Sequence, residues 1–316
     1  MKRKWLIGVT LGVLAVGVAA CGGSGDSGSD GASGLSGTIR IDGSSTVAPL
    51  TEGIAEEFQA SNPDVKVTVG TSGTGGGFEK FCAGETQASD ASRPIEPEEE
   101  ALCKKNGVTY EGLQVANDAL TVVVNPNNPV QCMTVDQLKQ VWEPNSTVKD
   151  WSEIKGLQPP FQGQLAAYGP GSDSGTFDYF TESINGEEGA QRSDYNDVGE
   201  DDNATVTGVT GSEGGIGYFG YSFFKENEGT VKALQVDNGN GCVSPSVETA
   251  QNGTYAPLSR PLFVYASGAA LKEKTVDEFL KFYLDNVNSI AEQIGFVPLT
   301  EAQVNESKAD LDKLIG

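Results

Sequence analysis

The sequence predicts an α/β fold with two lobes and a binding site between them. A strand, a turn rich in hydroxyls and glycines, and a helix follow one another at three places in the chain. Residues 120–125 form a continuous apolar run, typical of a strand buried on both faces of a sheet. The folded part has about 280 residues, enough for one large domain or two ordinary ones, and we expect two lobes. Open α/β sheets bind ligands beyond the carboxyl ends of their strands, so the three turns are the candidate binding elements.

The first 37 residues lie outside this predicted fold. Residues 1–20 combine three basic residues with an apolar run too short to span a membrane comfortably, which indicates an export signal. Val-Ala-Ala before Cys21 resembles a bacterial lipobox, so we expect cleavage there and lipid on Cys21, with an ordinary signal peptide as the alternative. Residues 21–37 are this cysteine and a flexible Gly/Ser tether.

The chain is strongly acidic, with a formal net charge of −23. Loss of the three basic residues of the export signal lowers this charge to −26. Such a charge argues against nucleic acid or an anionic membrane face as a partner. An anionic ligand stays possible, because surface charges are screened over about 8 Å in physiological salt and a desolvated pocket of dipoles can outweigh them.

Four cysteines remain besides the lipidated one, namely Cys82, Cys103, Cys132 and Cys242. Export permits disulfides. The absence of histidine and of a C-x-x-C spacing disfavours a metal site, and we expect none. Of the three possible pairings we favour Cys82 with Cys103 and Cys132 with Cys242, because each pair then lies within one lobe. Free, buried cysteines are the alternative.

The first two turns follow one another closely. Residues 38–42 alternate as a strand, and Ser45 and Thr46 follow in the turn before a helix, for which Ser44 or Ser45 is the expected cap. Residues 65–69 form a second strand, and the glycine-rich turn after it carries Ser72 and Thr74. The glycines match no nucleotide-binding loop. Hydroxyls and free N–H groups at a helix start favour a bound anion.

The third turn holds Ser174, Gly175 and Thr176, between a strand at residues 165–168 and an amphipathic helix that ends at Ile184. A serine in such a turn could be a nucleophile. The chain has no histidine, however, which excludes a Ser-His-Asp triad. We therefore interpret this turn as another anion-binding helix start, with a plain helix cap as the alternative.

Ser92 and Arg93 stand shortly after Asp90, in residues 88–95. An arginine beside serine and aspartate is commonly a surface pair. Its place directly after two turns suited to anions makes Arg93 a candidate ligand instead. The remaining expected elements are a solvated acidic helix start at 96–100, a capped helix at 134–142, an exposed excursion at 186–202, closely packed glycines and aromatics at 214–221, strands at 231–236 and 262–265, and helices from 275 and over 302–315.

Four motifs together resemble the PstS family, the phosphate-binding lipoproteins of bacterial phosphate ABC transporters. They lie at residues 43–47, 72–78, 91–95 and 174–176, in the family's order and approximate spacing. The resemblance covers nearly the whole mature chain and implies a type II periplasmic-binding-protein fold. Residues 38–120 with 262–316 would form lobe I and residues 121–261 lobe II, joined by crossover strands.

Carried onto this sequence, the resemblance implies phosphate contacts from Ser45 and Thr46, from Ser72 or Thr74, and from the Ser174, Gly175 and Thr176 turn. Some relatives place an arginine just before the last turn. This chain has none there, so Arg93, beside Ser92, is the candidate cation. Asp90 lies near the place of an aspartate that accepts the phosphate proton in some relatives.

The implied function is a receptor and not an enzyme. It would bind inorganic phosphate without a cofactor, deliver it to the membrane permease subunits of an ABC transporter, and act as a monomer held by its lipid on the outer face of the cytoplasmic membrane. A carboxylate acceptor would favour protonated phosphate over sulfate. The alternatives are a receptor for sulfate or molybdate, an exported phosphatase, and a surface protein that has lost the ligand.

Overall fold

The computed structural model describes residues 34–315. The predicted export signal, Cys21 and most of the predicted tether lie outside the described residues. The strands are β1 (Gly37–Gly43), β2 (Val65–Gly70), β3 (Ala88–Ala91), β4 (Tyr110–Val124), β5 (Cys132–Thr134), β6 (Ala166–Gly169), β7 (Asn196–Asp197), β8 (Gly215–Gly220), β9 (Lys232–Ala233), β10 (Gln235–Asp237), β11 (Cys242–Val243) and β12 (Ser259–Ser267). The α-helices are α1 (Ala48–Ser61), α2 (Gly73–Cys82), α3 (Pro97–Asn106), α4 (Val135–Trp142), α5 (Gly175–Asn185), α6 (Asp202–Thr210), α7 (Tyr221–Glu226), α8 (Val247–Gln251), α9 (Lys274–Gln293) and α10 (Glu301–Ile315).

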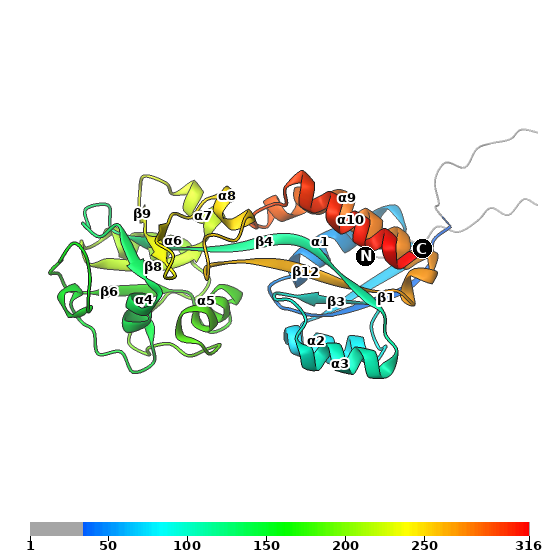
Figure 1. Cartoon of the computed structure of the whole chain (residues 1–316). Helices are drawn as coiled ribbons and strands as arrows, with labels where there is room; N and C mark the ends of the chain where they lie inside the picture. Colours follow the sequence, from blue (N-terminus) through cyan, green and yellow to red (C-terminus); the bar gives the residue numbers. More distant parts are fainter. Residues whose placement is uncertain (1–33, 316) are drawn as a thin grey trace, which may run out of the picture. The chain divides into compact units, whose positions relative to one another are not determined.

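The strands form one large mixed sheet and one small one. The large sheet has nine strands in the order β2-β1-β3-β12-β4-β8-β6-β7, with β9 beside β4, and the small sheet has the order β11-β10-β5. We call β1 to α3 with α9 and α10 lobe I, and β5 to α8 lobe II. The strands β4 and β12 pair antiparallel and run between the two lobes (Figure 1).

Alternating side chains show that both faces of the sheet are covered. In β12, Leu262 and Val264 join the core under α1 and α9, whereas Phe263 and Tyr265 pack on the other face with α2 and α3. The other end of β4 alternates in the same way between two cores of lobe II. The apolar strand predicted at 120–125 is this end of β4. Burial on both faces explains its continuous apolar sequence.

Two disulfides are present, and they join the pairs favoured from the sequence. Cys82 with Cys103 links α2 to α3 across a sequence separation of 21 residues. Cys132 with Cys242 links β5 to β11 across 110 residues. Each bridge lies within one lobe.

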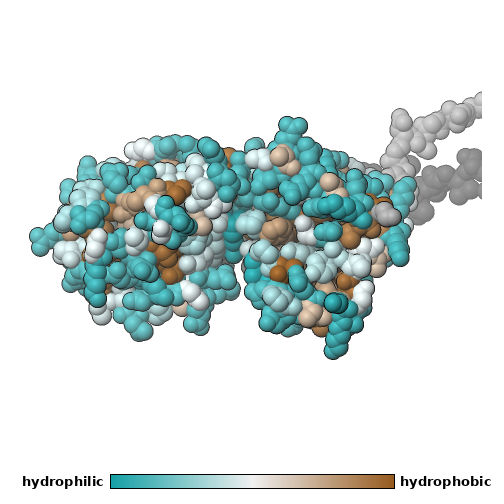
Figure 2. All heavy atoms as spheres, viewed as in Figure 1, coloured by the Kyte–Doolittle hydropathy of each residue, from teal (hydrophilic) through white to brown (hydrophobic). Residues whose placement is uncertain are grey.

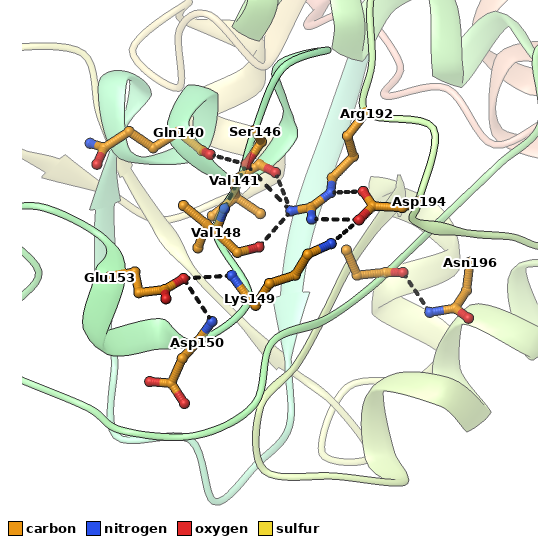
Figure 3. Close-up of polar contacts among 11 residues, drawn as sticks. Gln140, Val141, Ser146, Val148, Lys149, Asp150, Glu153, Arg192, Asp194 and Asn196 are labelled. Atoms are coloured by element: carbon orange, nitrogen blue, oxygen red, sulfur yellow. Dashed lines mark hydrogen bonds and ion pairs between the residues drawn. The ribbon is translucent and has the colours of Figure 1, made fainter.

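The excursion predicted at residues 186–202 is exposed only in part. Arg192 in its centre is 3% exposed. Its guanidinium donates to the carbonyls of Val141 (2.9 Å) and Val148 (3.1 Å) and pairs with Asp194, which also binds Lys149 (Figure 3). The predicted exposure holds for most residues of 186–202. It fails at Arg192, because these two carbonyls, at and beyond the end of α4, satisfy the hydrogen-bonding needs of its buried guanidinium.

Candidate functional site

The first turn lines a cavity with hydroxyl side chains. Gly43 at the end of β1 has a φ of 148°, and a side chain there would clash with the carbonyl oxygen of Asp90. The helix α1 begins after Val47 and has no side-chain cap, so the cap expected from Ser44 or Ser45 was wrong. The Ser44 hydroxyl instead accepts from the N–H of Val47 within the turn (3.4 Å). Ser45 and Thr46 line a cavity.

Of the two hydroxyls predicted in the second turn, Thr74 lines the cavity and Ser72 does not. The Ser72 hydroxyl donates to a carboxylate oxygen of Asp42 (2.5 Å), which turns Ser72 away from the cavity. Burial alone would raise the pKa of Asp42, but hydrogen bonds from Lys80 and Ser72 hold that pKa below its usual value. Thr74 lines the cavity, and its hydroxyl lies 3.1 Å from that of Ser92. The structure thus brings together Ser45, Thr46, Thr74 and Ser92.

Arg93 lines an adjoining, larger cavity, but its guanidinium is already engaged. Its two terminal nitrogens lie 2.9 and 2.8 Å from the two carboxylate oxygens of Glu99. Its Nε lies 3.3 Å from Glu96. A bidentate arginine–carboxylate pair is among the stronger polar contacts in proteins.

Asp90 is fully buried beneath the first turn. One carboxylate oxygen accepts from the Thr51 hydroxyl (2.9 Å), and the other has no hydrogen-bond partner among the described residues. Burial is the main cause that raises the pKa of Asp90 to about 8. Its backbone carbonyl accepts from the N–H of Ser44 (2.9 Å). Asp90 supports the first turn and is not among the residues that line the two cavities.

The third turn faces the first one. Ser174 is buried before the first residue of α5, and its side chain makes no capping bond. A Cβ atom built on Gly175 would lie 3.5 Å from the Thr46 hydroxyl oxygen, so the start of α5 approaches the first turn closely. Ser174, Gly175 and Thr176 do not line the two cavities, whereas Asp178 and Tyr179 from the following turn do.

Two cavities lie between these elements. The smaller has a volume of about 70 Å³ and the larger about 590 Å³. The smaller can hold a few atoms, since one water needs about 10–15 Å³. It is lined by Ser44, Ser45, Thr46, Gly73, Thr74, Ser92, Asp178, Tyr179, Glu182, Glu188 and Arg260. The mostly hydrophilic face in Figure 2 is hollowed between the lobes.

The sequence did not point to Arg260. This residue lies on β12, where its Nη2 donates to the Thr46 hydroxyl (3.2 Å) and its Nε to Asp118 (3.4 Å). Its guanidinium carbon lies 3.6 Å from the centre of the Tyr179 ring. The predicted strand began at residue 262, two residues too late to include it. An arginine at the start of an otherwise buried strand is the signal that could have found it.

Carboxylates also line the smaller cavity, from Asp178, Glu182 and Glu188. Burial, with the charge of Glu188, raises the pKa of Asp178, although the charge of Arg260 acts against this. Acceptors therefore stand beside the donors. Among residues 34–315, no group of three or more His, Cys, Asp or Glu side chains could hold a metal ion.

Comparison with known proteins identifies the family. A family model described as a PBP superfamily domain matches residues 28–287. The phosphate-binding protein PstS of Staphylococcus saprophyticus is 39% identical over 319 residues, which cover 100% of this chain and 96% of that protein. The chain belongs to the PstS family. The family and the α/β fold expected from the four motifs are confirmed.

Two further similarities agree with membership of the PstS family. Protein SphX of Synechococcus elongatus is 48% identical over 264 residues, covering 83% of this chain and 77% of that protein. The crystal structure of a possible phosphate binding protein from Planctomyces limnophilus superposes with a TM-score of 0.84 at 44% identity. That superposition covers 89% of this chain and 100% of the other.

Proposed function

We propose that this protein binds inorganic phosphate outside the cytoplasm and delivers it to the membrane permease of an ABC transporter. The observation that carries the proposal is the approach of two helix starts, with Thr46 and Gly175 facing each other beside a hydroxyl-lined cavity. The names of the relatives agree with it. As a substrate-binding protein of this kind, it would hold its ligand without transforming it.

The chemistry of the cavity suits a tetrahedral oxyanion. Such an ion has four oxygens to satisfy, and helix-start N–H groups with fixed hydroxyls supply donors in several directions. In this proposal Ser45, Thr46, Thr74 and Ser92 bind from lobe I. The turn of Ser174, Gly175 and Thr176 completes the site when the lobes close. Ser72 acts through Asp42 and not on the ligand.

The two lobes are proposed to close as units, with residues 38–120 and 262–316 in one and residues 121–261 in the other. Support comes from the separate cores around α1 and α9 and around Trp142 and Phe180. The strands β4 and β12 would act as the hinge. Substrate-induced closure around the ligand is a common behaviour of two-lobed binding proteins.

We further propose that the protein is exported and works as a monomer held by lipid on Cys21. Among residues 34–315, no helix is long and apolar enough to cross a membrane. The basic and apolar start of the sequence supports export. Mass spectrometry of the mature amino terminus tests the anchor. An unmodified residue other than Cys21 at that terminus would contradict it.

Calorimetry on the mature protein, stripped of carried-over phosphate, tests the function. Phosphate is expected to bind more tightly than sulfate. Thr46→Val and Thr176→Val are each expected to weaken phosphate binding about tenfold, because each removes a donor from a desolvated anion. Thr230→Val, at an exposed position away from the cavities, is the matched control. Tighter binding of sulfate would overturn the ligand, and unchanged affinity in both variants would overturn the site.

A further inference from the structure

We propose that Arg260 supplies the positive charge of the site, and that the bound anion takes the place of Glu182 beside the Arg260 guanidinium. The inference rests on the proposed function, since it names the residue that holds the phosphate charge. It differs from the expectation drawn from the sequence, in which Arg93 had this role.

Few positively charged side chains could pair with an anion in these cavities. Among the described residues that line the two cavities, Arg93 and Arg260 are the only positively charged ones. Both terminal nitrogens of Arg93 donate to the carboxylate oxygens of Glu99, at 2.8 and 2.9 Å, and its Nε pairs with Glu96. To meet an anion it would have to give up a bidentate pair, which is a strong contact. Arg93 is therefore poorly placed to bind phosphate.

The contacts of Arg260 are looser. Its Nη1 lies 3.8 Å from Glu182, whose side chain is 55% exposed. Its Nη2 donates to the neutral hydroxyl of Thr46 at 3.2 Å. An ion pair at such a distance, with its carboxylate exposed to solvent, contributes little, so a phosphate carrying up to two negative charges can replace Glu182 at small cost. The terminal nitrogens of Arg260 are thus available to a ligand.

A second set of contacts keeps the guanidinium in position during that exchange. Asp118 is 11% exposed at its side chain and accepts from Nε of Arg260, its partner in the β4–β12 register. The Tyr179 ring of α5 lies against the guanidinium face. Asp118 and Tyr179 therefore hold Arg260 by its Nε and its flat face, leaving the outer nitrogens to turn toward the anion.

Arg260 also touches both lobes. It meets the first turn through Thr46 and α5 through Tyr179 and Glu182. It starts from β12, one of the two strands between the lobes. An anion bound by Arg260 would lie where the helix starts of the two lobes converge, so charge recognition and lobe closure would depend on one side chain.

The experiment measures phosphate affinity by calorimetry in the stripped mature protein. Arg260→Gln is expected to weaken binding about 100-fold, whereas Arg93→Gln weakens it by a much smaller factor. Arg40→Gln, at an exposed position of lobe I, is the matched control. Arg260→Gln leaves Asp118 unpaired, so the double variant Arg260→Gln/Asp118→Asn is measured as well, and it should show the same loss with an unimpaired melting temperature. A larger loss in Arg93→Gln than in either Arg260 variant would overturn the proposal.

Glu182→Gln tests the exchange itself. This variant should tighten phosphate binding about threefold in the otherwise unchanged protein, because a competitor for Arg260 is removed. In the Arg260→Gln background the gain should vanish. An equal gain in both backgrounds would mean that Glu182 only repels the anion, and would overturn the exchange. If the unchanged protein itself does not bind phosphate, the failure lies with the proposed function and not with the choice of arginine.

Discussion

We predict that Asp178 distinguishes phosphate from sulfate. It stands in the first turn of α5 and lines the smaller cavity beside Arg260. A carboxylate there can accept the proton of hydrogen phosphate. Sulfate has no proton to donate at neutral pH, so the two acceptors would face each other.

Asp178→Asn is therefore expected to narrow the preference for phosphate over sulfate about tenfold, because an amide can donate to sulfate. Competition calorimetry with both anions measures the ratio. Asp173→Asn, at an exposed position in the turn before α5, is the matched control. An unchanged ratio of phosphate to sulfate affinity in Asp178→Asn would show that another carboxylate accepts the phosphate proton.

The buried carboxyl of Asp90 makes stability depend on pH. Its pKa is raised from 3.8 to about 8 in the folded protein, mainly by burial. Between these values the unfolded chain binds fewer protons than the folded one, so the free energy of unfolding falls as pH rises. Asp90→Asn should flatten that fall across this window.

Urea unfolding at several pH values, in buffer without phosphate, measures the slope. Asp64→Asn, which is exposed, is the control and should keep the slope of the unchanged protein. The same slope in Asp90→Asn would refute the assignment of this proton to Asp90.

Of the individual site residues, the sequence could predict those whose signal lies in neighbouring positions of the chain. The turn hydroxyls were found because glycines, hydroxyls and a helix start lie within a few residues of one another. Arg260 was missed because its role depends on pairing with Asp118, 142 residues away, and on Thr46, 214 residues away. The pairing of Arg93 with Glu99 was missed because a sequence does not give side-chain directions at a helix start.

Among the elements, local chemical signals predicted some helix starts correctly and others wrongly. The capping box at Thr134 and Gln137 is present at the start of α4. The strand expected at 231–236 is instead split into β9 and β10, which pair in different sheets. Only long-range pairing decides such a break, so periodicity in the sequence could not show it.

The Cys132–Cys242 disulfide should contribute strongly to the stability of lobe II. It closes a separation of 110 residues, which corresponds to about 4–5 kcal/mol in the chain-entropy model. Cys242 is exposed and Cys132 half-buried, so alanine substitution leaves no large cavity. The double variant Cys132→Ala/Cys242→Ala should lose about 4 kcal/mol in urea unfolding.

Reductant supplies the control for this measurement, since it should shrink the difference between the variant and the unchanged protein. A loss below about 1 kcal/mol without reductant would mean that the unfolded chain is already compact around this bridge.

For the whole molecule, two strands joining two separately packed cores favour a hinge. The pairing of β4 with β12 shifts register between Leu262 and Phe263, close to the pair of Asp118 with Arg260. Such an irregularity bends a strand locally and is common beside binding sites. The two-lobed fold could be predicted because the four motifs occur in the order and spacing of the PstS family. The contacts between the lobes could not be predicted, because the motifs do not give side-chain positions.

Locking the two lobes together tests whether they must part to admit phosphate. A Cβ atom on Gly175 would lie 3.5 Å from the Thr46 hydroxyl oxygen, so cysteines at both positions are within reach of a disulfide. Thr46→Cys/Gly175→Cys, oxidised without phosphate, should take up phosphate at least tenfold more slowly than the same variant after reduction, because the disulfide holds the two turns together and keeps the cleft from opening to the anion. Stopped-flow tryptophan fluorescence measures the rate, with Thr46→Cys alone under the same treatment as control. Equal rates in the oxidised and reduced double variant would mean that phosphate reaches the site without any parting of the lobes.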